Sequence, residues 1–266
     1  MFDLFADCAA CEPVFAAASE HLGQDPRRFV READREALFA DREAQILCCT
    51  HALVAWAGLG SARPERAVIA GYSVGELAAW GCAGALDAAA TLRLTHRRAN
   101  IMEAIAPPDG GLAGIVGLTC TVLDPILLRH DTAIAIINDT DSFVIGGHAA
   151  ALEASCQEAL ANGATRAHRI PVAVPSHTKL LAKAVEPFRL ALREATPRQP
   201  QIMYRLLSGI DGDAVHDVEA ACEKLARQIC TPVDWMACLE SCHEAEVGTW
   251  ARYSIEPHGG AILFFR

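Results

Sequence analysis

The chain has 266 residues, of which 52% are hydrophobic, and its 23 basic and 33 acidic side chains give a net charge of −10 near neutral pH. This acidic balance argues against nucleic acid or an anionic membrane surface as the main partner. No run of 18 apolar residues and no basic leader is present, so the sequence predicts neither a membrane-spanning helix nor a signal peptide. We expect a cytoplasmic protein with one large core, or one core with an insertion.

The spacing of apolar residues predicts a mainly helical first part, with helices at 3–22, 26–40 and 43–58 and a strand followed by a helix at 67–80. Asp87 is expected to cap a long helix that ends near Ile105. The run Pro107-Pro108-Asp109-Gly110-Gly111 would end that helix and marks the best candidate for a domain boundary.

The next segment alternates strands and helices, with elements expected at 112–118, 122–129, 133–137, 143–145, 149–161 and 167–172. This order, βαββαβ, is typical of a ferredoxin-like subdomain. The remainder returns to α/β character, with expected elements at 177–195, 204–208, 217–229, 233–244 and 249–255. We therefore divide the chain into an α/β unit with a parallel sheet, formed by residues 1–108 and 173–266, and a ferredoxin-like insertion at 109–172.

Eleven cysteines are scattered singly or in short pairs, mostly along alanine-rich segments. In a reducing compartment such residues act as small apolar side chains. Cys8 and Cys11 have the spacing of half a zinc site or of a redox motif, but no second cysteine or histidine pair follows at a suitable distance. Core packing is the better interpretation, and the sequence predicts no metal site.

The most specific motif is Gly71-Tyr72-Ser73-Val74-Gly75, which lies between the β-branched run 67–70 and the helix formers that start at Glu76. A strand, G-x-S-x-G and a helix form the layout of a nucleophile elbow. The glycines permit a tight turn, and the start of the helix directs free N–H groups and positive potential at the serine. Ser73 is therefore the candidate nucleophile, with a glycine-rich structural turn as the alternative.

A serine hydroxyl needs a neighbouring base, and ten histidines are available. His177, in Val174-Pro175-Ser176-His177, is the best candidate because it lies at a proline-containing junction between a strand and a helix, next to apolar residues. A histidine at the start of a helix is also common on protein surfaces. Taken alone, its position leaves both interpretations open.

Together these motifs resemble the malonyl-CoA:acyl carrier protein transacylase family, over about residues 5 to 245. The run from Gly71 to Glu76 is similar to the family's G-H-S-x-G-E, with Tyr72 in place of histidine, and 174–177 is similar to its V-P-S-H. The resemblance implies that Ser73 is the nucleophile and His177 the base. It also implies an α/β-hydrolase-like acyltransferase core for the larger unit.

The resemblance implies roles for four further positions. Arg98 matches the arginine that binds the malonyl carboxylate, and Gln45 matches a glutamine at the acyl pocket. Gln228 matches the glutamine whose carbonyl orients the histidine, and the backbone N–H of Val74 would bind the oxyanion. A guanidinium can bind a carboxylate through two parallel hydrogen bonds, which agrees with the choice of Arg98; a solvated helix charge is the alternative.

The implied reaction transfers malonyl from coenzyme A to the phosphopantetheine thiol of an acyl carrier protein through a seryl acyl-enzyme, with no bound cofactor or metal. Within the family, Tyr72 and the run from Gly75 to Trp80 look most like the epsilon subunit of malonate decarboxylase, with a stand-alone transacylase of fatty acid or polyketide synthesis as the alternative. Two alternatives remain: a catalytically impaired subunit that binds acyl-CoA or its carrier protein, and a serine esterase or thioesterase, for which His258 would be the candidate base.

Two family features have no clear match in the sequence. One is the N-terminal strand and G-Q-G-S-Q loop, which donates a second N–H to the oxyanion, and the other is a C-terminal E-L-G-P-G, where 255–260 corresponds only loosely. From these departures we expect either that the start of the gene is misplaced, or that oxyanion stabilisation is weaker and the activity impaired. We also expect one flank of the strand at 67–70 to be an open edge, with poor solubility as a consequence.

Overall fold

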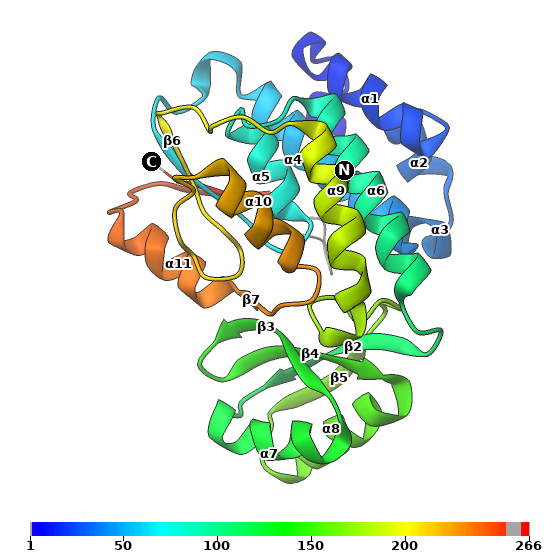
Figure 1. The fold of residues 1–266 in the computed structure, drawn as a ribbon. Coiled ribbons are helices and arrows are strands. Elements are labelled where there is room, and N and C mark those ends of the chain that lie inside the picture. The colour runs from blue at the N-terminus through cyan, green and yellow to red at the C-terminus, as the bar shows by residue number, and fades with distance from the viewer. Residues whose placement is uncertain (1, 254–261, 266) are drawn as a thin grey trace.

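Two β-sheets organise the chain, whose computed structural model describes residues 2–253 and 262–265 (Figure 1). The sheet of the larger unit has four strands, in the order β6 (Tyr204–Leu206), β1 (Ala67–Gly71), β9 (Ile262–Phe265) and β8 (Trp250–Tyr253). Every residue of β1 is buried. The predicted parallel pairing is present between β1 and β6, whereas the β1–β9 and β8–β9 pairs are antiparallel.

The second sheet has the order β5 (Arg166–Ile170), β2 (Gly110–Val116), β4 (Ser142–His148), β3 (Ala133–Asp139) and β7 (Val233–Asp234). Its first four strands pair antiparallel, and helices α7 (Cys120–His130) and α8 (Ala149–Ala161) cover one face (Figure 1). This arrangement confirms the α/β class and the ferredoxin-like subdomain. The short strand β7 comes from the later chain and pairs in parallel with β3, which ties the subdomain to the larger unit.

Helices form most of the larger unit. Those before β2 are η1 (Asp3–Phe5), η2 (Ala9–Cys11), α1 (Glu12–Leu22), α2 (Pro26–Glu32), α3 (Arg35–Phe39), α4 (Asp41–Gly58), η3 (Gly60–Ala62), α5 (Gly75–Cys82) and α6 (Ala88–Ile105). Those after β5 are η4 (Lys179–Ala184), α9 (Val185–Ala195), α10 (Val218–Arg227) and α11 (Trp235–Glu244). Asp87 caps α6 as predicted, because its Oδ1 accepts a hydrogen bond from the Ala90 N–H at 2.7 Å.

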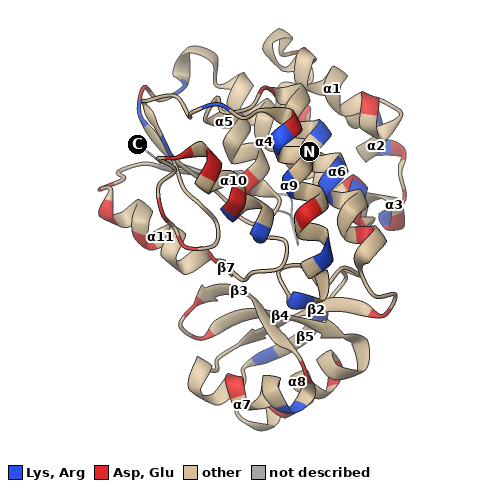
Figure 2. Cartoon of the chain, viewed as in Figure 1, with Lys and Arg blue, Asp and Glu red and all other residues tan. Residues whose placement is uncertain are grey.

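The core of the larger unit lies where α4, α5 and α6 pack together behind β1. Ile46, Leu77, Trp80 and Leu92 are among its fully buried side chains. Around this core, charged residues of both signs are spread over α6, α9 and α10 (Figure 2). Within the described part of the chain, no helix combines the length and hydrophobicity that crossing a bilayer requires.

The predicted open edge on the strand at 67–70 is wrong. β9 pairs antiparallel with β1 at four positions, from Val68 opposite Phe265 to Gly71 opposite Ile262. β6 occupies the other flank of β1 through parallel pairing. Both edges of β1 are therefore covered, because a strand from the C-terminal end provides the second neighbour. The segment 255–260, with His258, lies outside the described residues.

The single helix expected at 177–195 is also wrong in its first part. His177 has φ +63°, a left-handed conformation that an α-helix cannot contain. Its N–H donates to the Ile229 carbonyl at 2.8 Å, so its backbone pairs with the segment after α10 rather than with a helix. Regular structure starts only at η4 and continues as α9.

Candidate active site

Ser73 lies at the turn between β1 and α5. Its φ of +53° is left-handed, which is rare for a residue with a side chain and is found where surrounding structure holds a strained turn. A Cβ at Gly71 would lie 2.2 Å from the backbone nitrogen of Glu76, so only glycine fits there. The strand, the strained serine and the following helix have the geometry of a nucleophile elbow.

The side chain of His177 lies between Ser73 and Gln228. Its Nε2 is 2.7 Å from Ser73 Oγ, and its Nδ1 is 2.6 Å from the Gln228 carbonyl oxygen. A carbonyl can only accept, so Nδ1 carries the hydrogen and donates it, which leaves Nε2 as the acceptor for the Ser73 hydroxyl. This tautomer is the one that removes a proton from Ser73.

The surroundings keep His177 neutral. Burial lowers the pKa of His177 to about 3, the charge of Arg98 acts in the same direction, and the hydrogen bond to the Gln228 carbonyl opposes them. The imidazole, only 1% exposed, is therefore unprotonated at neutral pH and available as a base.

Arg98 projects from α6 and is 2% exposed. Its two terminal nitrogens donate to Gln45 Oε1 at 2.6 Å and to Gln228 Oε1 at 3.3 Å. None of the ion pairs within the described residues involves this guanidinium. Burial lowers the pKa of Arg98, because a desolvated cation is disfavoured, and nearby Asp41 opposes the shift. A buried cation held by neutral oxygens is suited to bind an anion.

Gln228, at the C-terminal cap of α10, makes hydrogen bonds to four residues of the site. Its backbone carbonyl accepts from His177, and its side-chain oxygen accepts from Arg98. Its Nε2 donates to Glu76 Oε2 at 2.6 Å and to the Ser73 carbonyl at 3.1 Å. One residue thus fixes the distances between the serine, the histidine and the arginine.

Glu76 is the second residue of α5 and is 1% exposed. Besides Gln228, the N–H of Gly209 donates to its Oε2 at 3.0 Å. Burial raises the pKa of Glu76 to about 7, and these hydrogen bonds oppose the shift. Val74 completes this end of the site, since its N–H lies just before α5 and donates to no acceptor within residues 2–253 and 262–265.

The structure brings all six predicted positions together: Ser73 and Val74 in the elbow, His177 in the loop before η4, Arg98 in α6, Gln45 in α4 and Gln228 after α10. Sequence reasoning assigned no role to Asp41 or Glu76, which contact the two glutamine amides. Glu76 carried a signal, because it is a carboxylate in the apolar segment after the elbow. Asp41 carried none, because it resembles any acidic residue near a helix start.

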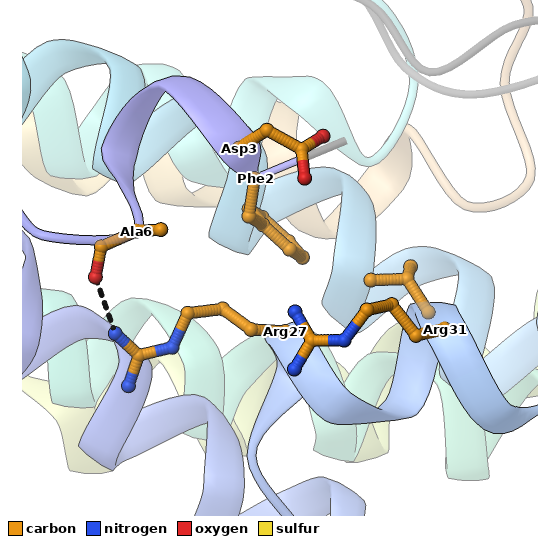
Figure 3. Close-up of a pocket in the computed structure, with 6 residues that line it drawn as sticks. Phe2, Asp3, Ala6, Arg27 and Arg31 are labelled. Atoms are coloured by element: carbon orange, nitrogen blue, oxygen red, sulfur yellow. Dashed lines mark hydrogen bonds between the residues drawn. The ribbon is translucent and has the colours of Figure 1, made fainter.

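A small cavity of about 110 Å³ lies elsewhere, between the N-terminal turn and α2 (Figure 3). Arg27 and Arg31 line it together with Phe2 and Asp3, and Arg27 donates to the Ala6 carbonyl at 3.0 Å. No predicted site residue lines this cavity. Among the side chains that the structure describes, no group of three or more His, Cys, Asp or Glu could hold a metal ion.

Comparison with known families gives the site its context. The model of a family described as "Acyl transferase domain" matches residues 9–260. The chain belongs to the acyl transferase domain family. A curated relative of this acyl transferase domain, the malonyl CoA-acyl carrier protein transacylase of Escherichia coli K12, is 30% identical over 98% of this chain and 85% of its own length.

Solved structures of relatives have the same fold as this acyl transferase domain. An acyl-carrier-protein S-malonyltransferase from Burkholderia pseudomallei matches with a TM-score of 0.84 at 29% identity, over 92% of this chain and 81% of that one. A malonyl-transacylase solved in complex with a type II polyketide synthase acyl-carrier protein matches with a TM-score of 0.85 at 27% identity, over the same shares of the two chains.

Proposed function

We propose that this acyl transferase domain transfers malonyl from coenzyme A to the phosphopantetheine thiol of an acyl carrier protein, through an ester on Ser73. The observation that carries the proposal is the buried Arg98 guanidinium, which Gln228 joins to the Ser73–His177 pair. Among the residues that the structure describes, amide oxygens are its only hydrogen-bond acceptors. The relatives named as malonyl transacylases support the same donor and acceptor. The relative solved with its carrier protein supports a protein acceptor.

In the first half-reaction, His177 Nε2 takes the proton of Ser73 as Oγ attacks the thioester carbonyl of malonyl-CoA. The negative charge that develops on the carbonyl oxygen is stabilised by the free Val74 N–H at the start of α5. The C–S bond then breaks, and the protonated His177 returns its proton to the sulfur of coenzyme A. Malonyl remains as an ester on Ser73.

The second half-reaction reverses these steps with a different thiol. His177 removes the proton of the phosphopantetheine thiol, whose sulfur attacks the malonyl ester. The C–O bond to Ser73 breaks, and Oγ takes the proton back from His177. Throughout, the Gln228 carbonyl holds the imidazole in the required tautomer.

Arg98 provides the selection for malonyl. The carboxylate of a malonyl group can accept two charge-assisted hydrogen bonds from the guanidinium, whereas an acetyl group has no such acceptor. With acetyl bound, the buried cation would be left without an anion, which is unfavourable. Gln45 and Gln228 position the guanidinium without neutralising it.

Two finer points belong to the same proposal. The acyltransferase core comprises residues 1–108 and 173–266, and the ferredoxin-like subdomain comprises 109–172. The reaction needs no metal or bound cofactor, since the coenzyme A thioester is itself a substrate. The resemblance to the epsilon subunit of malonate decarboxylase and a cytoplasmic location stay predictions from the sequence.

Single-turnover labelling tests the proposal. The protein is mixed with malonyl-CoA labelled in the acyl group, and label is followed on the protein, on added holo acyl carrier protein and in free malonate. We expect rapid label on the protein and its passage to the carrier thiol. Rapid release to water with the carrier present would indicate an esterase or thioesterase, and absence of protein-bound label would indicate a subunit that only binds; either result contradicts the proposal.

A further inference from the structure

Asp41, the first residue of α4, has a contact that the proposed mechanism does not use. Its Oδ2 accepts a hydrogen bond from Gln45 Nε2 at 2.7 Å. The oxygen of the same amide accepts from Arg98 at 2.6 Å. The carboxylate, the amide and the guanidinium therefore form a continuous chain that leads to the proposed malonyl site.

The chemistry of the two ends fixes the direction of the amide between them. A guanidinium only donates hydrogen bonds, and an ionised carboxylate only accepts them. If the Gln45 amide were reversed, its NH₂ would face the guanidinium and its oxygen would face the carboxylate, and both hydrogen bonds would be lost. Asp41 thus favours the one orientation in which the oxygen of Gln45 faces Arg98.

The other terminal nitrogen of Arg98 has the same arrangement. There the Gln228 amide presents its oxygen to Arg98 at 3.3 Å and its Nε2 to Glu76 at 2.6 Å. In both cases a carboxyl group is one amide away from the guanidinium and does not pair with it. The repetition indicates that neutral acceptors position the cation while its charge stays available for a ligand.

We propose that Asp41 is a positioning residue for substrate selection, which orients the Gln45 amide so that Arg98 is held ready for the carboxylate of the acyl group. This inference rests on the proposed function and adds to it a determinant of the preference for malonyl over acyl groups without a carboxylate. Burial raises the pKa of Asp41 to about 6, while the charge of Arg98 and the hydrogen bond from Gln45 favour the ionised form.

Two substitutions at Asp41 separate its hydrogen bond from its charge. Asp41→Asn and Asp41→Ala both remove the charge, but only asparagine keeps an oxygen that can accept from Gln45 Nε2. Any change in the electrostatic attraction for malonyl is common to both variants. The ratio of their affinities therefore reports the orienting hydrogen bond alone.

Affinities are measured by calorimetry for malonyl-CoA and acetyl-CoA, with each variant in a Ser73→Ala background that cannot form the ester. We expect malonyl-CoA to bind about fivefold more weakly to Asp41→Ala than to Asp41→Asn, as loss of one orienting hydrogen bond implies. The affinities of the two variants for acetyl-CoA should differ by less than twofold. Equal malonyl-CoA affinities, or equal losses for the two ligands, would overturn the inference, the latter by indicating a general structural role.

A double-mutant cycle gives a second measure in the same background. Gln45→Leu removes the oxygen that faces Arg98, so it should weaken the binding of malonyl-CoA selectively. Adding Asp41→Ala to this variant should weaken that binding by less than a further twofold. Additive losses would overturn the inference. Malonyl labelling of the protein with native Ser73 is run in parallel. Absence of label would overturn the proposed function and this inference with it. Label on the protein, together with equal malonyl-CoA affinities of the two Asp41 variants, would overturn the inference alone.

Discussion

Replacement of Arg98 by methionine tests the proposed basis of malonyl selection. Methionine keeps much of the volume and removes the charge. Because the side chain is only 2% exposed, solvent screens its interaction with a bound carboxylate little. Two charge-assisted hydrogen bonds contribute about 1.5–3 kcal/mol each, and losing a buried charged partner typically costs about 2–5 kcal/mol.

A loss of about 3 kcal/mol corresponds to a fall of about 150-fold in kcat/KM for malonyl transfer. Acetyl transfer should hold or rise, because the variant no longer leaves a buried cation without an anion when acetyl is bound. The assay measures kcat/KM for transfer of malonyl and of acetyl from their coenzyme A thioesters to a holo carrier protein. Malonyl transfer within fivefold of the parent, or equal losses for both acyl groups, would refute the reasoning.

Arg97 offers a matched control on the same helix. It is 38% exposed and forms an ion pair with Glu194 at the surface. Arg97→Met makes the same chemical change one residue away from Arg98, and the loss of an exposed ion pair contributes at most about 1 kcal/mol to stability. We expect its malonyl kcat/KM to stay within twofold of the parent, which would assign the effect at Arg98 to position rather than to loss of an arginine from α6.

Three further results are expected. His177→Ala should slow Ser73 acylation by at least about 10³-fold in a rapid-quench assay, since it removes both the base and its orientation, and a rate within tenfold of the parent would place the base elsewhere. Because the pKa of His177 is lowered to about 3, the base stays unprotonated between pH 5 and 7.5, and the parent's acylation rate should not fall through its protonation in this range. A rate that falls with an apparent pKa near 6.5 as the pH is lowered would contradict this. Burial raises the pKa of Glu76 from 4.5 to about 7, so the native state of the parent loses stability as the pH rises between these values. In urea unfolding, the free energy of unfolding of Glu76→Gln should therefore rise by roughly 3 kcal/mol relative to that of the parent between pH 4.5 and 8. A difference between the two proteins that does not depend on pH would be inconsistent with a buried carboxyl that ionises.

Local patterns in the sequence predicted much of the fold. The helix at 149–161 has the predicted bounds, and Asp87 caps α6, because periodicity and a capping side chain are properties of neighbouring residues. The grouping of Ser73, His177 and Arg98 could also be expected, because separate motifs in a fixed order resembled one family. Their contacts in the structure agree with that grouping.

The features that sequence reasoning missed depend on contacts between distant segments. The left-handed backbone of His177 depends on its hydrogen bond to the Ile229 carbonyl, which no local pattern reveals. The partner of β1 on its second flank is a strand almost 200 residues later, so the open edge could not be excluded from the sequence near 67–70. The contact of Asp41 with Gln45 is local, but its meaning comes from Arg98 on another helix.

The most direct test of a seryl acyl-enzyme is mass spectrometry of the protein after brief mixing with malonyl-CoA. Formation of a malonyl ester adds C₃H₂O₃, about 86 Da from atomic masses, and peptide mapping locates it. The proposed function predicts this adduct on Ser73, its absence in a Ser73→Ala variant that unfolds at the same temperature as the parent, and its loss when holo acyl carrier protein is added. An adduct that persists in Ser73→Ala, or a parent protein that passes malonyl to the carrier without any ester on Ser73, would contradict it.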